Sequence, residues 1–248
     1  MKILVCISHV PDTTSKINFT ADATEFDTNG VQFVINPHDE FALTRAVWFK
    51  EQQGAQLTVV TVGDASCEPT LRKALAIGAD SAVRIDTPAK DGFAVATEIA
   101  AYAKGENFDL ILAGRESIDY NGGMVPGILA TQLDFNFVNS CVDIQVEGET
   151  ATCKREIDGG TETLELPLPA VVSGQKGMVE EKDLKIPNMR GIMMARKKPL
   201  AVVAAQGAAD KTQVNSFEKP AEKAACKMVD AENLDQLIEL LHNEAKVI

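Results

Sequence analysis

The sequence predicts an α/β fold: a parallel sheet flanked by helices, an antiparallel hairpin extension, and a C-terminal arm that ends in a helix. Over the first 135 residues, short apolar runs alternate with stretches of helical period. Between residues 138 and 166 the pattern changes to polar and apolar residues in alternation. With 248 residues, 45% of them hydrophobic, the chain can bury one substantial core, or one core and a small appendage.

Buried parallel strands are expected where the chain is continuously apolar for a few residues. Such runs occupy residues 2–8, 56–62, 81–86 and 108–113. Helices are expected between them at residues 39–53, 69–77 and 93–104, which repeat apolar residues at steps of three and four. A further helix is expected from the Gly122-Gly123 pair to about residue 133. Strands that alternate with helices indicate a parallel sheet covered on both faces.

The second half begins with hairpin chemistry. Residues 138–146, 150–157 and 163–166 alternate around two turns rich in Gly, Asp and Glu, which is typical of antiparallel strands. After Pro167 and Pro169, residues 170–172 return to a buried strand. From Pro199 to about residue 229 there is no clear period, and residues 231–245 form an amphipathic pattern. We therefore expect an α/β domain at 1–199 and an arm with a terminal helix at 200–248.

Composition excludes several classes of function. A net charge of -12 and a pI near 4.8 argue against nucleic acid as the main partner. No run of about 18 apolar residues predicts a membrane span. Residues 2–7 begin a strand pattern without a cleavage site, so we expect a cytoplasmic protein. Five scattered cysteines and three isolated histidines indicate reduced thiols and no metal site.

Residues 184–209 contain no carboxylate, although the protein is acidic. The segment is rich in methionine and is closed by Arg196, Lys197 and Lys198. Flexible thioether chains adapt to a partner surface, and clustered cations attract an acidic one. The segment therefore suits docking to another macromolecule. A core strand or helix followed by a solvated turn explains the same composition about as well.

A ligand is expected where parallel strands end, because helix N-termini there present backbone amides to phosphates. Three segments qualify, residues 8–12, 61–64 and 114–125, and the last has two glycines directly before a helix. It matches no established phosphate-binding motif, so a structural turn explains it equally well. Residues 36–40 fit a helix start, with Pro37 in the turn and carboxylates in the first turn.

Four co-linear segments resemble the β subunit of the electron transfer flavoproteins. They are MKILVCISHVPDT at 1–13, NPHDEFALTRA at 36–46, LRKALAIGAD at 71–80, and residues 155–198, which include an Arg-x-x-Asp-Gly-Gly-x-Glu-x-Leu pattern from Arg155 and a Pro-Asn step at Pro187. Two departures are Cys153, where the family has a small aliphatic residue, and extra length after Asn188. The resemblance implies an adenine-nucleotide α-hydrolase-like fold.

The resemblance also implies a function. This chain would pair with a larger α subunit that holds most of an FAD, and the arm and C-terminal helix at 200–248 would pack on that subunit. The pair would carry electrons from dehydrogenases such as acyl-CoA dehydrogenase and pass them on to a redox partner. The docking loop would be residues 184–198, with Ile186 as the apolar anchor beside Pro187, Asn188 and Met189. Two alternatives stay open: a subunit of an electron-bifurcating, NADH-oxidising flavoprotein with a second FAD, and a stand-alone adenine-nucleotide-binding regulatory domain.

Family members of this kind bury a structural AMP in the β subunit. The positions that would contact it here share a place near the strand ends: Cys6, Asn36, Asp39, Val62, Gly122, Gly123, Met124 and Val125. Typical AMP-binding members have Asn, Gln and Thr at the last three of these positions, so phosphate contacts would pass to backbone amides. The bifurcating branch has Asp-Gly-Asp-Thr where this chain has Asp-Tyr-Asn-Gly from Asp119. AMP is favoured over FAD or an empty site.

Overall fold

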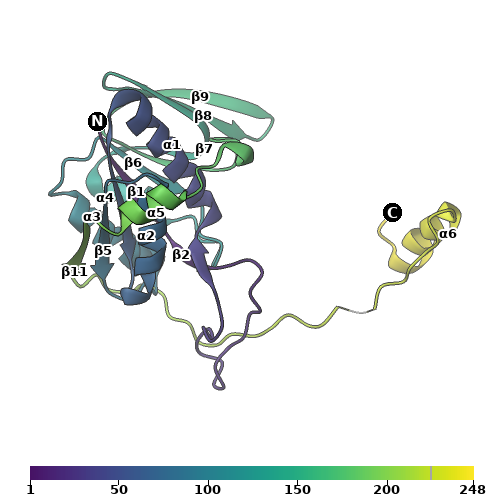
Figure 1. The fold of residues 1–248 in the computed structure, drawn as a ribbon. Coiled ribbons are helices and arrows are strands. Elements are labelled where there is room, and N and C mark those ends of the chain that lie inside the picture. The colour runs from purple at the N-terminus through teal and green to yellow at the C-terminus, as the bar shows by residue number, and fades with distance from the viewer. Residues whose placement is uncertain (224) are drawn as a thin grey trace.

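The computed structural model describes residues 1–223 and 225–248, and it confirms the predicted α/β fold (Figure 1). The strands of the main sheet are β1 (Lys2–Cys6), β4 (Gln56–Val62), β5 (Ser81–Asp86), β6 (Leu110–Gly114), β7 (Asn136–Glu147), β8 (Thr150–Ile157), β9 (Gly160–Pro167), β10 (Ala170–Gly174) and β11 (Leu200–Ala204). Their order is β11-β5-β4-β1-β6-β10-β7-β8-β9. Neighbours are parallel from β11 to β7 and antiparallel from β7 to β9.

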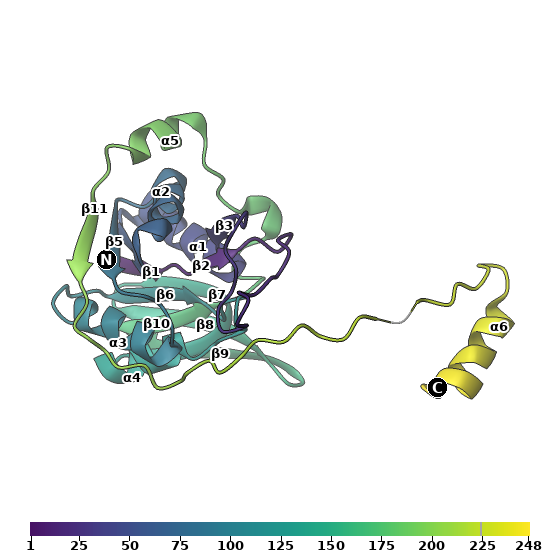
Figure 2. The same ribbon diagram turned by 90° about the horizontal axis from the view of Figure 1, so that it is seen from below.

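The helices cover both faces of the sheet, as the alternating pattern predicts. Figure 2 shows α1 (Pro37–Gln53) and α2 (Glu68–Ile77) on one face, and α3 (Gly92–Ala103) and α4 (Val125–Leu133) on the other. Side chains of β1 alternate between the two layers. Ile3 packs in the cluster of α1 and α2, whereas Leu4 packs in the cluster of α3 and α4, and both are fully buried. A strand buried on both faces needs the continuous apolar run that predicted it.

The antiparallel extension grows from β7, which changes partners along its length. Its first half pairs in parallel with β10, and its second half pairs antiparallel with β8. A register shift lies between Cys141 and Asp143, where the strand changes partner. Arg45 of α1 donates hydrogen bonds to Asp143 and to the carbonyl of Ile144, which ties the extension to the main helical layer.

A second, two-stranded sheet was not predicted from the sequence. It pairs β2 (His9–Pro11) with β3 (Phe33–Ile35) in antiparallel register, and residues 12–32 form a long excursion between them. Each strand has only three residues, too short for a visible period.

The C-terminal third differs in part from expectation. Residues 200–204, expected to begin the arm, form β11 and pair in parallel with β5 at the sheet edge. Inside the expected docking loop, Met189–Ala195 form a short helix, α5. The terminal helix is confirmed as α6 (Leu234–Glu239), continued by a π-helical segment (Leu240–Ala245), and Figures 1 and 2 show it away from the main body. No helix among the described residues has both the length and the apolar character of a membrane span.

Candidate functional site

The topology places a crevice at the carboxyl ends of β1 and β6. From β1 the chain builds toward β4 and β5 on one side, and then crosses to β6 on the other side. Such a reversal of strand order opens a space above the sheet where ligands of doubly wound proteins bind. The expected cofactor residues Cys6, Asn36 and Asp39 all lie around this point.

Asp39 joins the ends of these two strands. Its Oδ2 accepts a hydrogen bond from the backbone N–H of Ser8 at 2.7 Å, and its Oδ1 accepts one from Gly114 at 2.8 Å. The side chain is almost fully buried, and burial raises the pKa of Asp39 to about 7 against the opposing effect of these hydrogen bonds. A Cβ atom at Gly114 would lie 2.4 Å from Asp39 Oδ1, so only glycine fits there. Both oxygens of the Asp39 side chain therefore accept hydrogen bonds from the backbone of this chain.

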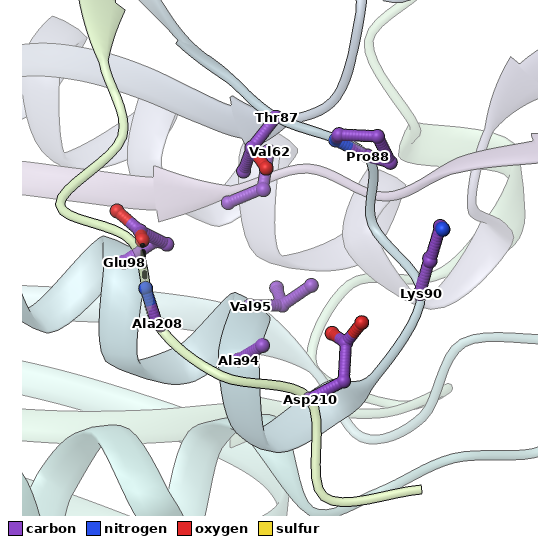
Figure 3. A pocket seen from close by; sticks show the side chains of 9 residues that line it. All are labelled: Val62, Thr87, Pro88, Lys90, Ala94, Val95, Glu98, Ala208 and Asp210. Carbon is purple, nitrogen blue, oxygen red and sulfur yellow. Dashed lines mark hydrogen bonds between the residues drawn. The ribbon is translucent and has the colours of Figure 1, made fainter. Parts of the chain in front are cut away.

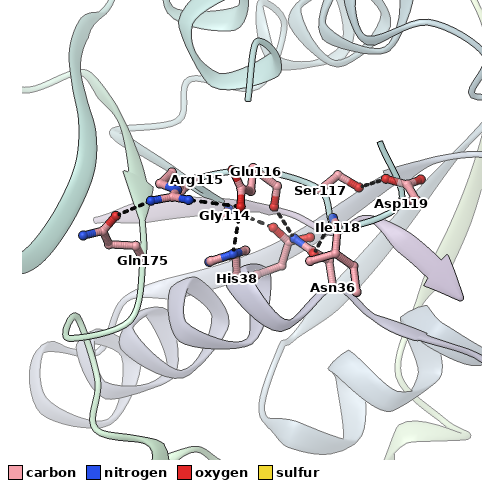
Figure 4. Close-up of polar contacts among 10 residues, drawn as sticks. Asn36, His38, Gly114, Arg115, Glu116, Ser117, Ile118, Asp119 and Gln175 are labelled. Atoms are coloured by element: carbon pink, nitrogen blue, oxygen red, sulfur yellow. Dashed lines mark hydrogen bonds and ion pairs between the residues drawn. The ribbon is translucent and has the colours of Figure 1, made fainter. Parts of the chain in front are cut away.

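Asn36 fixes the loop that follows β6. Its Nδ2 donates to the carbonyl of Glu116 at 2.8 Å, and its Oδ1 accepts from the N–H of Ile118 at 3.3 Å (Figure 4). The same loop is closed by reciprocal backbone hydrogen bonds between Ser117 and Gly122. A fully buried asparagine with both ends of its amide bonded positions the loop.

The start of α4 has no side-chain cap. Its N-cap residue, Met124, has no side-chain hydrogen bond to the helix. By contrast, α3 begins with Asp91, whose carboxylate accepts from the amides of Phe93 and Ala94. Amides at the start of a helix attract anions. Of these two helix starts, the one preceded by Gly122 and Gly123 is therefore available to a phosphate.

Cys6 and Val62 close the strand ends beneath this region. Both side chains are buried, and burial raises the pKa of the Cys6 thiol well above its ordinary value. A pocket of about 210 Å³ lies beside Val62, and α3 forms part of its wall (Figure 3). Cys6 is thus an apolar contact surface with no reactive thiolate.

A polar cluster beside the crevice was not identified from the sequence. His38 Nε2 lies 3.5 Å from Glu116 Oε1, and the Arg115 guanidinium contacts both Glu116 and Gln175 at 3.0 and 3.2 Å (Figure 4). Burial lowers the pKa of His38, which favours the neutral imidazole. Gln175 directly follows β10, which lies far from β6 in the sequence but pairs with it in the sheet. No local sequence pattern therefore indicates that Gln175 and Arg115 meet.

The expected docking residues lie on a separate surface, over α2. Ile186 and Met189 are 82% and 76% exposed, although both are large and apolar. Asn188 caps α5 by accepting a hydrogen bond from the N–H of Gly191 at 2.8 Å. Gly191 itself lies against α2, where an added Cβ would be 2.4 Å from the carbonyl oxygen of Ala76. Met189 is thus presented on a helix that is backed by α2, and Ile186 is exposed in the segment before that helix.

These features define a doubly wound α/β protein with a crevice at its topological switch point and an exposed apolar surface around α5. The family model described as "Electron transfer flavoprotein domain" matches residues 24–208. The chain belongs to the electron transfer flavoprotein family.

Similar proteins match all or most of the length of this chain. The "Electron transfer flavoprotein subunit beta" of Syntrophomonas wolfei subsp. wolfei is 38% identical over 257 residues, covering 100% of this chain and 98% of the relative. The protein of the same name from Bacillus subtilis is 33% identical over 262 residues, with both chains fully covered. The one from Bos taurus is 34% identical over 235 residues, 91% of each chain. The resemblance to β subunits found in the sequence is confirmed.

Proposed function

We propose that this chain is the β subunit of a heterodimer that carries electrons. An FAD held mainly by an α subunit accepts electrons from dehydrogenases, such as acyl-CoA dehydrogenase, and the complex passes them to a redox partner. The flavin supplies the redox chemistry, and this chain supplies positioning and docking. Membership of the family supports this role, as do the names of the β-subunit relatives.

One observation carries the docking part of the proposal. Ile186, Met189 and Met193 are 82%, 76% and 66% exposed, and they belong to one short segment of the chain. Exposed apolar residues in such a group mark an interaction surface. Arg190, Arg196 and Lys197 are exposed in the same segment and would attract an acidic rim on the dehydrogenase.

The test of docking is Ile186→Ala in the co-purified complex. We expect electron transfer from the dehydrogenase to fall by about tenfold, since a buried interface anchor is worth about 1–2 kcal/mol or more. Flavin absorbance is expected to remain. Ile157→Ala is the matched control, because Ile157 is an exposed isoleucine at the end of β8. Equal rates for both variants and the original chain would reject the docking role.

We infer that the crevice holds a structural AMP. The open first turn of α4 and the glycines before it support a bound phosphate. The pocket beside Val62 is about 210 Å³, below the range of about 300–1,000 Å³ for sites that enclose a whole drug-sized ligand. It has room for one part of a nucleotide.

Mass spectrometry of the nucleotides released from the denatured complex tests this assignment. One FAD and one AMP per heterodimer is the expected result. Two FAD would favour the bifurcating alternative, and a monomer that binds ATP without flavin would favour the regulatory domain.

We also propose that the protein works in the cytoplasm. The five cysteines are all free thiols in the structure, and four of them are buried, which suits a reducing compartment. Fractionation of cells followed by immunoblotting tests this location, and recovery outside the cytoplasmic fraction would contradict it.

A further inference from the structure

The arm is bound to the α/β body immediately after the last strand of the sheet. The backbone N–H groups of Gln206 and Ala208 donate to the two carboxylate oxygens of Glu98, each at 2.7 Å. Glu98 lies on α3 and is only 3% exposed. A buried carboxylate that lost these donors would be left without compensation, which is costly. The arm is therefore held at this place by the body itself.

A second anchor follows four residues later. The hydroxyl of Thr212 donates to Oδ2 of Asp91, while Oδ1 of the same carboxylate caps α3. The Thr212 hydrogen bond is the main cause that lowers the pKa of Asp91. The amino group of Lys211 lies over the ring of Phe93, 5.4 Å from its centre. Residues 206–212 are thus fixed along the start of α3.

Between the two anchors, the arm forms a wall of the pocket beside Val62. Ala208 and Asp210 come from the arm, and they face walls made by the end of β4, the segment after β5 and the first turn of α3 (Figure 3). The pocket is lined by Val62, Thr87, Pro88, Lys90, Ala94, Val95, Glu98, Ala208 and Asp210. Since Glu98 is occupied by the arm, the ionic groups that remain for a ligand are Lys90 and Asp210.

These two groups suit different parts of a nucleotide. A carboxylate only accepts hydrogen bonds, so Asp210 suits a hydroxyl or amino donor of a nucleoside and repels a phosphate. An ammonium suits a phosphate. The pocket also adjoins the open start of α4, because a Cβ on Gly92 would lie 3.0 Å from Cγ of Met124. A ligand with its phosphate at α4 therefore has this pocket next to it.

We propose that arm residues 206–212 form one wall of the nucleotide site, with Asp210 in contact with the nucleoside and Lys90 with the phosphate. The proposal rests on the proposed function in one respect, the AMP in the crevice. It adds that the arm, expected only to pack on the partner subunit, also binds the ligand of its own domain. Asp210 and Lys90 become ligand-contacting residues.

Titration of the nucleotide-depleted complex with AMP and with adenosine tests this site. Asp210→Asn is expected to weaken binding of both ligands by about tenfold, the effect of one good hydrogen bond to a charged group. Lys90→Gln is expected to weaken the binding of AMP by about tenfold and to leave the binding of adenosine unchanged. Asp158→Asn and Lys104→Gln are the controls, because both residues are exposed and lie outside the pocket.

Glu98→Gln tests the anchor, since an amide cannot accept both backbone donors. Amide hydrogen exchange at residues 206 and 208 is expected to speed up, and AMP affinity to fall. If the original chain binds AMP and neither Asp210→Asn nor Glu98→Gln changes its affinity, the arm is no part of the site, while the nucleotide role stands. If the original chain binds no AMP, both proposals are overturned.

Discussion

Arg72 on α2 holds the carbonyl oxygen of Ala195, the last residue of α5, at 2.8 Å from its Nη1 atom. The same atom contacts the carbonyl of Lys198 at 2.8 Å. In return, Lys198 Nζ donates to the carbonyls of Leu75 and Ala79 on the α2 side at 2.8 and 2.6 Å. These crossed hydrogen bonds fix residues 195–198 onto α2.

Arg72→Met should release these residues. We expect faster amide exchange over residues 195–199 and a loss of about 1–2 kcal/mol in the free energy of unfolding, from two backbone acceptors left unpaired. Electron transfer from the dehydrogenase should fall with unchanged flavin content. Lys73→Met is the control, because Lys73 forms a partly exposed ion pair with Glu40, and such pairs are worth about 0–1 kcal/mol. Equal exchange in both variants would contradict the clamp.

Gly191→Ala tests the close contact between α5 and α2. Alanine normally stabilises a helix by up to about 1 kcal/mol relative to glycine. Here its Cβ would be 2.4 Å from the carbonyl oxygen of Ala76, so we expect a net loss of about 1–3 kcal/mol, or displacement of α5. Urea denaturation measures the loss of stability, and amide hydrogen exchange over residues 189–195 reports displacement of α5. At Gly160 an added Cβ meets nothing within 4 Å, which makes Gly160→Ala the control. A more stable Gly191→Ala variant would refute the packing.

Asp39→Asn should destabilise the sheet at its switch point. One amide oxygen can accept from Ser8 or from Gly114, and the amide N–H₂ group then faces the other N–H. We expect the free energy of unfolding to fall by about 1–3 kcal/mol at neutral pH, the cost of one unsatisfied buried donor. Denaturant titration of Asp39→Asn beside Asp158→Asn, an exposed turn position, gives the comparison. Equal midpoints would show that the bridge contributes little.

The same carboxyl predicts a pH dependence. Burial raises the pKa of Asp39 from its ordinary value of 3.8 to about 7. Between these values the folded chain therefore binds more protons than the unfolded chain, and linkage makes the contribution of Asp39 to stability fall as pH rises. The stability of the original chain minus that of Asp39→Asn should decrease from about pH 4 to pH 7. Urea titrations at several pH values measure this difference, and an increase would show the opposite shift.

Phe19→Ala tests a third contact of the arm. The rings of Phe19 and Phe217 stack with centres 4.9 Å apart, and the N–H of Phe217 donates to the carbonyl of Ala23 at 2.7 Å. A stacked aromatic pair contributes about 0.5–1.5 kcal/mol. Loss of the stack should therefore speed amide exchange near residue 217 by about threefold to tenfold. Ile17→Ala changes an exposed apolar residue of the same excursion and should leave the arm protected. Faster exchange in Ile17→Ala as well would mean a general loosening of the excursion.

Much of the fold was predictable because its signals are local. The apolar run of β1 and the helical periods of α1 to α3 each lie within one element. The run indicates a strand that is buried on both faces, and each period indicates a helix that is buried on one face. β11 was less visible. Its five residues follow Pro199 and are mostly exposed, and only pairing with β5 at the sheet edge makes them a strand.

The sequence by itself determined the alternation of strands and helices in the α/β layers and the family, because period and motif are properties of neighbouring residues. Tertiary structure alone decided what those residues do. It placed Gly114 on the carboxylate of Asp39, 75 residues away, and the arm on the buried carboxylate of Glu98. A hydrogen bond between a side chain and a distant backbone amide leaves no pattern in the chain, because every residue except proline carries that amide.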